Sequence, residues 1–263
     1  MKLGFIGCGN MATAIINGIV SNNIVKAEEI IVSDKSGAAA ERMKPFGITA
    51  INDNREIVKQ CDIIVFAVKP QFIGEVTDEI KDLVTKEKLF ISIVAGKTIE
   101  WFNEHLTKDM KLVRTMPNTP ALVGEGMTGV CANENVTKED MDEALRILKG
   151  FGKAEVVPER LMDVVVSVSG SAPAYVFMFI EAMADAAVAD GMPRAQAYEF
   201  AAQAVMGSAK LMMETGKHPG ELKDMVCSPG GTTIEAVRVL EQKGFRSAVI
   251  EAMKACAEVS RRL

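Results

Sequence analysis

The stretch Gly4-Phe5-Ile6-Gly7-Cys8-Gly9-Asn10-Met11-Ala12 decides the fold of this chain. A short apolar run ends in the pattern G-x-G-x-x-A, and a helical pattern begins directly after it. In such a turn the first glycine makes the tight bend, the second lets the backbone reach a pyrophosphate, and the alanine permits close packing of helix on strand. The glycine pattern alone is weak, but its strand–turn–helix context is specific. We therefore expect a dinucleotide to bind here, at Gly7, Cys8, Gly9, Asn10, Met11 and Ala12.

Short β-branched runs alternate with helical patterns over the first part of the chain. The expected strands are 2–6, 30–33, 63–67, 89–94, 112–116 and 127–132, and the expected helices are 10–21, 37–44, 72–85 and 138–150. Strand–helix alternation with nearly continuous apolar strands is typical of a parallel sheet covered on both faces. The predicted fold is therefore α/β, with a Rossmann-type doubly wound sheet in a first domain, residues 1–157.

The remainder, residues 158–263, is expected to be an all-α domain. Its predicted helices are 172–190, 194–215, 220–226, 233–243 and 245–261, with Ser171 as the N-cap of the first and Pro173 in its first turn. The two long helices are apolar on more than one face, which a domain of about a hundred residues can hardly cover. We infer a helical dimer interface; a single tight core is the alternative.

Composition excludes several classes of protein. A net charge of −5 argues against a nucleic-acid or anionic-membrane surface. The five cysteines contain no C-x-x-C pair and the two histidines lie apart from them, so we expect no disulfide framework, no metal site and a reducing, cytoplasmic location. No signal peptide is expected before the first strand. The most apolar long stretch contains Glu181 and Asp185, which favours a buried helix over a membrane span.

Further cofactor residues are expected where the strands end, because ligands of doubly wound sheets bind at the carboxyl ends of the strands. Asp34 after the second strand favours a ribose 2′-hydroxyl, hence NAD, whereas Ser33 with Lys35 can hold a 2′-phosphate. These residues leave the choice of cofactor open. Later strand ends add Ala67, Val68, Lys69, Pro70, Ala95, Gly96 and Asn118.

A second glycine-rich turn, Ser228-Pro229-Gly230-Gly231-Thr232-Thr233, opens a helix late in the chain. Free amides at a helix start and the helix dipole favour an anion there, and the threonine hydroxyls can donate further hydrogen bonds. An ordinary capped turn is the simpler interpretation of this motif taken alone.

Seven motifs together resemble those of the pyrroline-5-carboxylate reductase family over essentially the whole chain. They are GFIGCGNMA (4–12), AVKPQ (67–71), VAGKT (94–98), RTMPNTPALV (114–123), VSGSAPAYVFMFIEAMADAAV (168–188), HPGELKDMVCSPGGTTIEAV (218–237) and EQKGF (241–245). The resemblance implies a Rossmann domain followed by a helical dimerisation domain, dimers that commonly assemble into decamers, and NADPH as cofactor with some tolerance of NADH. Asp34 departs from the small or phosphate-friendly residue that relatives often carry, which puts a strict NADPH preference in doubt.

The resemblance also implies residue roles and a reaction. Asn54 matches a further cofactor contact; Ser228, Gly231, Thr232 and Thr233 match the loop that grips the substrate carboxylate. Thr233 matches the catalytic threonine, which bonds the ring nitrogen. The implied reaction reduces 1-pyrroline-5-carboxylate to L-proline, the last step of proline biosynthesis.

Related 3-hydroxy-acid dehydrogenases carry a lysine after a glycine-rich turn, and the comparable run 169–175 contains none, which disfavours alcohol oxidation. A reductase of another small carboxylated cyclic imine, or a non-catalytic nucleotide-binding regulator, are the alternatives.

Overall fold

The structure is a computed structural model that describes residues 2–35 and 37–262. The chain divides into two compact units, one holding the residues up to Ser171 together with those from Cys256 onward, the other holding Ala172–Ala255. The two sequence-based domains, 1–157 and 158–263, remain a prediction. In the structure, the helical residues before Ala172 and the end of the last helix belong to the first compact unit.

The first unit is built on one mixed sheet with strand order β3-β2-β1-β4-β5-β6-β7-β8. The strands are β1 Leu3–Ile6, β2 Ile30–Ser33, β3 Thr49–Ile51, β4 Ile63–Phe66, β5 Leu89–Ser92, β6 Lys111–Met116, β7 Gly126–Ala132 and β8 Gly152–Val156. The order reverses between β1 and β4, which is the switch point where doubly wound sheets bind ligands. The fold class predicted from the sequence is confirmed.

The expectation of a parallel sheet is wrong for β7 and β8, which both run opposite to the other six strands. β7 runs antiparallel to β6, with Met116 opposite Gly129 and Val113 opposite Ala132, while the other pairs are parallel. The connection between them is a short 3₁₀ turn, Thr119–Val123, rather than a crossover helix. A parallel neighbour needs a connection of a dozen or more residues, so this short link returns the chain antiparallel.

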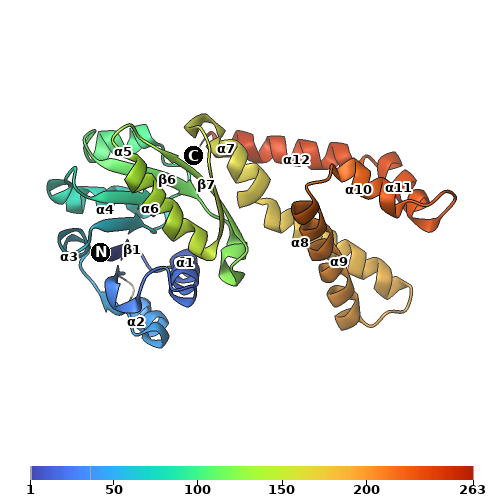
Figure 1. The fold of residues 1–263 in the computed structure, drawn as a ribbon, viewed down its shortest axis with the longest axis horizontal. Coiled ribbons are helices and arrows are strands. Elements are labelled where there is room, and N and C mark those ends of the chain that lie inside the picture. The colour runs from blue at the N-terminus through green and yellow to red at the C-terminus, as the bar shows by residue number, and fades with distance from the viewer. Residues whose placement is uncertain (1, 36, 263) are drawn as a thin grey trace. The chain divides into compact units, whose positions relative to one another are not determined.

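Helices cover both faces of the sheet (Figure 1). They are α1 Asn10–Ser21, α2 Ala38–Met43, α3 Asn54–Gln60, α4 Ile73–Ile80, α5 Ile99–His105, α6 Lys138–Leu148 and α7 Met162–Val165. Alternate strand residues enter two separate cores: Phe5 packs in the first, with α1, and its neighbour Ile6 in the second, with α3 and α4. Phe66 stacks on Phe90 and Phe102 in the second core, each pair 5.5 Å between ring centroids. Burial on both faces explains the continuous apolar strands.

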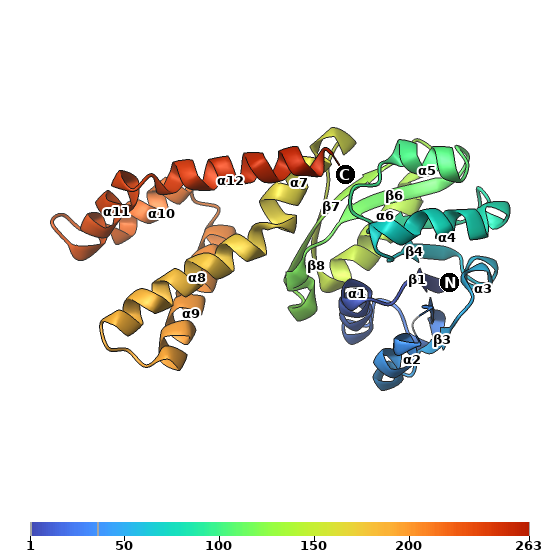
Figure 2. The same cartoon turned by 180° about the vertical axis from the view of Figure 1, so that it is seen from behind.

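The second unit is helical, as predicted. It contains α8 Ala172–Ala189, α9 Arg194–Thr215, α10 Pro219–Val226, α11 Thr232–Gln242 and most of α12 Phe245–Ser260. α8 and α9 lie side by side (Figure 2), joined through Gly191, which has a φ of +97°. Phe177, Met178 and Phe200 are 64–70% exposed. A single copy therefore leaves large apolar side chains in water, as expected of a face that a partner covers.

The prediction that Ser171 caps a helix start is wrong. Residues Val166–Gly170 form a turn of π-helix, and Ser171 continues the helical run with its N–H donating to the Val166 carbonyl at 2.8 Å. The Ser171 hydroxyl instead accepts from the Cys256 thiol at 3.2 Å. Proline is tolerated at any helical position whose backbone N–H has no acceptor within the helix, and the first turn of a helix offers such positions. A π-helical turn leaves backbone N–H groups without acceptors as well, so its serine–proline pattern resembles a helix start.

Candidate active site

The predicted cofactor turn joins β1 to α1. Gly7 has a φ of +96°, and a Cβ there would lie 2.6 Å from the Ala67 carbonyl oxygen, so glycine is required. Two charged side chains brace the next residue: the Cys8 N–H donates to Asp34 Oδ2 at 3.0 Å, and Arg42 Nη1 donates to the Cys8 carbonyl at 2.6 Å. Arg42 was not among the sequence-predicted site residues.

The N-terminus of α1 is shaped for an anion. Gly9 is its N-cap; in the described part of the chain no side chain caps it and no acid stands in the first turn. Apart from its two chain neighbours, no described residue has an atom within 4 Å of the position that a Cβ on Gly9 would take. The space over the turn is therefore open. Uncapped amides and the helix dipole then face that space, which fits a dinucleotide pyrophosphate.

The Cys8 thiol of this turn stays neutral. Cys8 is fully buried, and burial raises the pKa of its thiol, with the Asp34 carboxylate adding to the effect and Thr13 and Arg42 opposing it. A protonated thiol is uncharged. The thiol therefore adds no negative charge to the turn at neutral pH.

The predicted adenosine-side residues gather after β2. Ser33 is buried and its hydroxyl donates to Asn54 Oδ1 at 2.8 Å, while Asn54 Nδ2 donates to Glu79 Oε2 at 2.9 Å. Lys35 Nζ lies 4.0 Å from Glu79 and 3.9 Å from Glu75. These contacts connect the end of β2 to α3 and α4 in one polar network.

The remaining predicted cofactor residues follow other strands at the same edge. Ala67 to Pro70 follow β4, Ala95 and Gly96 follow β5, and Asn118 follows β6, and these strands run parallel to β1. Asn118 is buried, accepts from the Met127 N–H at 2.8 Å and donates to the Ser169 carbonyl at 3.0 Å. The structure thus brings the predicted cofactor residues to one edge of the sheet, and their roles stay predictions.

An aromatic stack follows the loop after β5. Lys97, next to Gly96, places its ammonium 5.2 Å from the centroid of the Trp101 ring, and the His105 ring stacks on Trp101 with the two ring centroids 3.9 Å apart. Thr98 begins α5 by accepting from the Trp101 N–H at 3.0 Å. The single tryptophan of the chain therefore lies in the first turn of α5, which follows the predicted cofactor residues Ala95 and Gly96.

The predicted substrate loop belongs to the second unit, between α10 and α11. The Gly231 N–H donates to the Ser228 carbonyl at 3.0 Å, with Pro229 and Gly230 between them and a φ of +66° at Gly230, the pattern of a type II turn. Gly231 is the N-cap of α11, and among described residues no side chain caps it. A Cβ on Gly231 would collide with the Ser228 hydroxyl, which therefore leans over the helix start. The amides of Thr232 and Thr233 open this helix, and Thr233 is half-buried.

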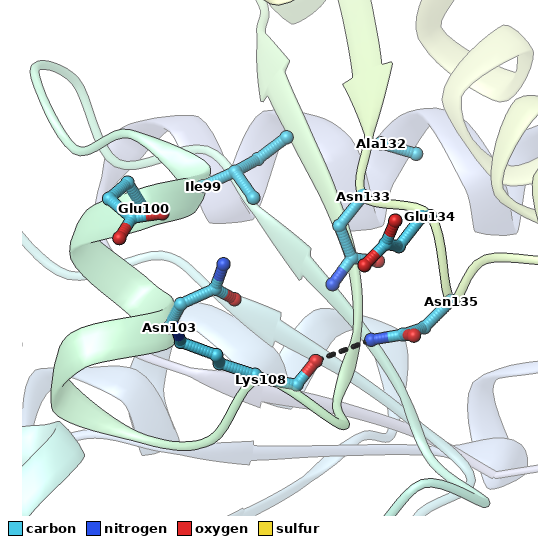
Figure 3. Close-up of a pocket in the computed structure, with 8 residues that line it drawn as sticks. All are labelled: Ile99, Glu100, Asn103, Lys108, Ala132, Asn133, Glu134 and Asn135. Carbon is cyan, nitrogen blue, oxygen red and sulfur yellow. Dashed lines mark hydrogen bonds between the residues drawn. The ribbon is translucent and has the colours of Figure 1, made fainter.

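A separate cavity of about 420 Å³ lies at the other end of β6 (Figure 3). Ile99, Glu100, Asn103, Lys108, Ala132, Asn133, Glu134 and Asn135 line it, and it includes none of the predicted site residues. Asn135 donates to the Lys108 carbonyl at 2.5 Å, the bond drawn in Figure 3, and Asn133 donates to the Met110 carbonyl at 2.7 Å. These two side-chain amides hold the backbone of the segment that leads into β6, which is a structural role.

Comparisons with known proteins agree with this arrangement. A family model described as pyrroline-5-carboxylate reductase dimerisation matches residues 159–263, and one described as NADP oxidoreductase, coenzyme F420-dependent, matches residues 2–96. The first match includes the helical run Glu159–Ala189, which by length and composition alone could also cross a membrane.

Three relatives that match over nearly their whole length are pyrroline-5-carboxylate reductases or a pyrroline carboxylate reductase by name. The chain is 56% identical to the pyrroline-5-carboxylate reductase of Escherichia coli K12, over 100% of this chain and 98% of that protein, and 39% identical to the Arabidopsis thaliana enzyme, over 100% and 95%. The Plasmodium falciparum pyrroline carboxylate reductase, solved with NADP bound, superposes with a TM-score of 0.91 at 36% identity, covering 100% of this chain and 97% of that one. Shared identity at this level over the whole length places the chain in the pyrroline-5-carboxylate reductase family, the NAD(P)H-dependent oxidoreductases of proline biosynthesis.

Proposed function

We propose that this chain reduces 1-pyrroline-5-carboxylate to L-proline with NADPH, accepts NADH as well, and uses the residues described above in the following roles. The Gly7–Ala12 turn and the start of α1 bind the pyrophosphate. Ser33, Asp34, Lys35 and Asn54 surround the adenosine ribose, and Ala67 to Pro70, Ala95, Gly96 and Asn118 line the rest of the dinucleotide. The open, uncapped helix start at Gly9 supports this assignment.

On the substrate side, the helix start at Gly231 binds the carboxylate. The amides of Gly231, Thr232 and Thr233 and the Ser228 hydroxyl donate to it, and the Thr233 hydroxyl orients the ring nitrogen. The uncapped start of α11, with Gly231 kept bare of a Cβ by the Ser228 hydroxyl, is the observation that carries this proposal.

Reduction of the imine requires few further groups from the protein. When bound, the reduced nicotinamide supplies a hydride to the carbon of the C=N bond. The protonated imine accepts it: a C–H bond forms, the π electron pair moves to nitrogen, and the product is a secondary amine. Thr233 holds that nitrogen throughout, so the residues contribute by positioning, an effect worth up to roughly 7–11 kcal/mol. The absence of a lysine in the sequence run 169–175 agrees, since imine reduction needs no base for an alcohol proton.

Substitution of Thr233 tests the assignment. Thr233→Ala should lower kcat/KM for the five-membered imine by about 10²-fold, the loss of one positioned contact at a reacting centre. Thr233→Ser should retain most activity because it keeps the hydroxyl. Thr215→Ala is the matched control, because the Thr215 hydroxyl bonds its own helix, to the Leu211 carbonyl at 2.7 Å. An unchanged kcat/KM in Thr233→Ala would remove the catalytic role of Thr233.

We further propose a homodimer formed through the helical region 158–263, with dimers assembling into decamers, in the cytoplasm. The exposed side chains of Phe177, Met178 and Phe200 support a dimer, because burying them removes apolar surface from water. Sedimentation with Phe177→Glu tests the first step: the variant should shift toward monomer, and an unaltered assembly would exclude this face from the interface.

A further inference from the structure

Two opposite charges hold the two polar atoms of one residue in the cofactor turn. Asp34 accepts from the Cys8 N–H at 3.0 Å, and Arg42 donates to the Cys8 carbonyl at 2.6 Å. Asp34 stands directly after β2 and Arg42 lies on α2, the next helix along the chain. This is the edge at which a doubly wound sheet receives the adenosine ribose, where a 2′-hydroxyl and a 2′-phosphate are told apart.

Among the described residues at this edge, the predicted ribose contacts Ser33, Lys35 and Asn54 face carboxylates or one another. Lys35 lies within 4.0 Å of both Glu75 and Glu79, and Asn54 joins Ser33 to Glu79. Arg42 differs, because the bond that holds its guanidinium goes to a neutral carbonyl. A phosphate is a stronger acceptor than a carbonyl and matches the guanidinium fork with two hydrogen bonds, so exchange of partner favours an incoming phosphate. To bind the same phosphate, the Lys35 ammonium would first have to leave the carboxylates of Glu75 and Glu79.

Asp34 acts in the opposite sense. A ribose 2′-hydroxyl can donate to its carboxylate, whereas a 2′-phosphate meets a like charge. We propose that Arg42 binds the 2′-phosphate of NADPH and that Asp34 opposes it, so that the pair sets the NADPH-to-NADH affinity ratio of this chain. The inference rests on the proposed function, in which the Gly7–Ala12 turn binds the dinucleotide.

Calorimetric binding separates the two residues without catalysis. The ligands are NADPH, NADH, and the fragments adenosine 2′,5′-bisphosphate and 5′-AMP, titrated into the wild-type chain, Arg42→Gln and Asp34→Ser. Glutamine can still donate to the Cys8 carbonyl, so Arg42→Gln removes the charge and keeps the brace. Lys44→Gln, two positions further along the chain and exposed, is the matched control for loss of one positive charge.

Arg42→Gln should weaken NADPH and the 2′,5′-bisphosphate by about 10- to 100-fold, the worth of a charge-assisted contact, and change NADH and 5′-AMP by less than about threefold. Asp34→Ser should raise the NADPH-to-NADH affinity ratio by about 10-fold. Equal weakening of all four ligands in Arg42→Gln would assign Arg42 to bracing the turn and overturn the proposal, as would no change at all. Failure of the wild-type chain to bind either dinucleotide would instead refute the proposed function itself.

Discussion

Gly9 can be altered with almost no effect on folding and a large effect on cofactor binding. Its φ of −77° and ψ of −171° suit any residue, and a Cβ would enter open space. Gly9→Ala should therefore gain about 0.4–1 kcal/mol from a stiffer unfolded chain and lose about as much at the N-cap, where alanine is poor. The added methyl stands where the pyrophosphate approaches. A displacement of about 1 Å there should cost about 10²-fold in cofactor affinity, or about 2.7 kcal/mol.

Gly7→Ala provides the contrast within the same turn. Its φ of +96° costs a side chain about 1–2 kcal/mol, and a Cβ 2.6 Å from the Ala67 carbonyl oxygen costs a further 1–3 kcal/mol or so. At about 2–4 °C per kcal/mol, Gly7→Ala should lower Tm by about 4–20 °C, while Gly9→Ala leaves it nearly unchanged. Thermal unfolding and titration with NADPH measure the two effects, with Gly74→Ala, an open glycine on α4, as control. Wild-type NADPH affinity in Gly9→Ala would refute the assigned turn.

Three further outcomes follow from charge and burial in the first unit. Glu159→Ala should lower the unfolding free energy in urea by about 1.5–3 kcal/mol, because Glu159 accepts from Arg114 and from the Ile99 N–H, both at 2.8 Å; a loss below about 0.5 kcal/mol would mark the pair as a weak surface contact. Burial is the largest single effect and raises the pKa of the Asp140 carboxyl, but the hydrogen bonds from Lys111 and Thr137 and the charge of Lys111 together hold that pKa below its ordinary value. This contribution to stability is therefore full above about pH 4 and disappears as the pH falls through the lower folded pKa. Lys111→Met should then flatten the loss of Tm between about pH 4 and pH 2, and an unchanged slope would contradict the reasoning. Burial raises the pKa of the Cys61 and Cys131 thiols to about 11. Iodoacetamide at about pH 8, followed by mass spectrometry, should therefore modify the partly exposed Cys227 well before Cys61 and Cys131. Equal labelling of the three cysteines would show that the first unit opens readily.

Most elements of the fold were predictable where periodicity was strong. α9, Arg194–Thr215, begins and ends at the predicted residues, because Pro193 and Gly216 are clear boundaries. β3 and β8 were missed: Thr49–Ile51 is too short to show alternation, and in Gly152–Val156 only Ala154 is buried. α3 was missed although Asp53 caps it by accepting from the Glu56 N–H, a capping pattern readable in the sequence.

The site was predictable to the extent that its residues sit in local motifs. The glycine turn and the strand ends carry their own sequence patterns, so the residues that lie at this edge of the sheet could be named from the sequence, and their cofactor roles remain predictions. Arg42 could not, because it reaches the Cys8 carbonyl across 34 positions and stands in an ordinary helix. The π-helical turn at Val166–Gly170 likewise depends on packing: a Cβ on Gly170 would lie 2.9 Å from the Met116 methyl.

The indole of Trp101, which contacts Lys97 and His105, is an intrinsic fluorescent probe of this chain. Trp101 is the single tryptophan, and its emission overlaps the absorption of a reduced nicotinamide, so resonance energy transfer to NADPH or NADH should quench it. Trp101 lies in the first turn of α5, directly after the loop that follows β5. Occupancy of the dinucleotide site can therefore be followed in the native chain, without label or turnover, by exciting one indole.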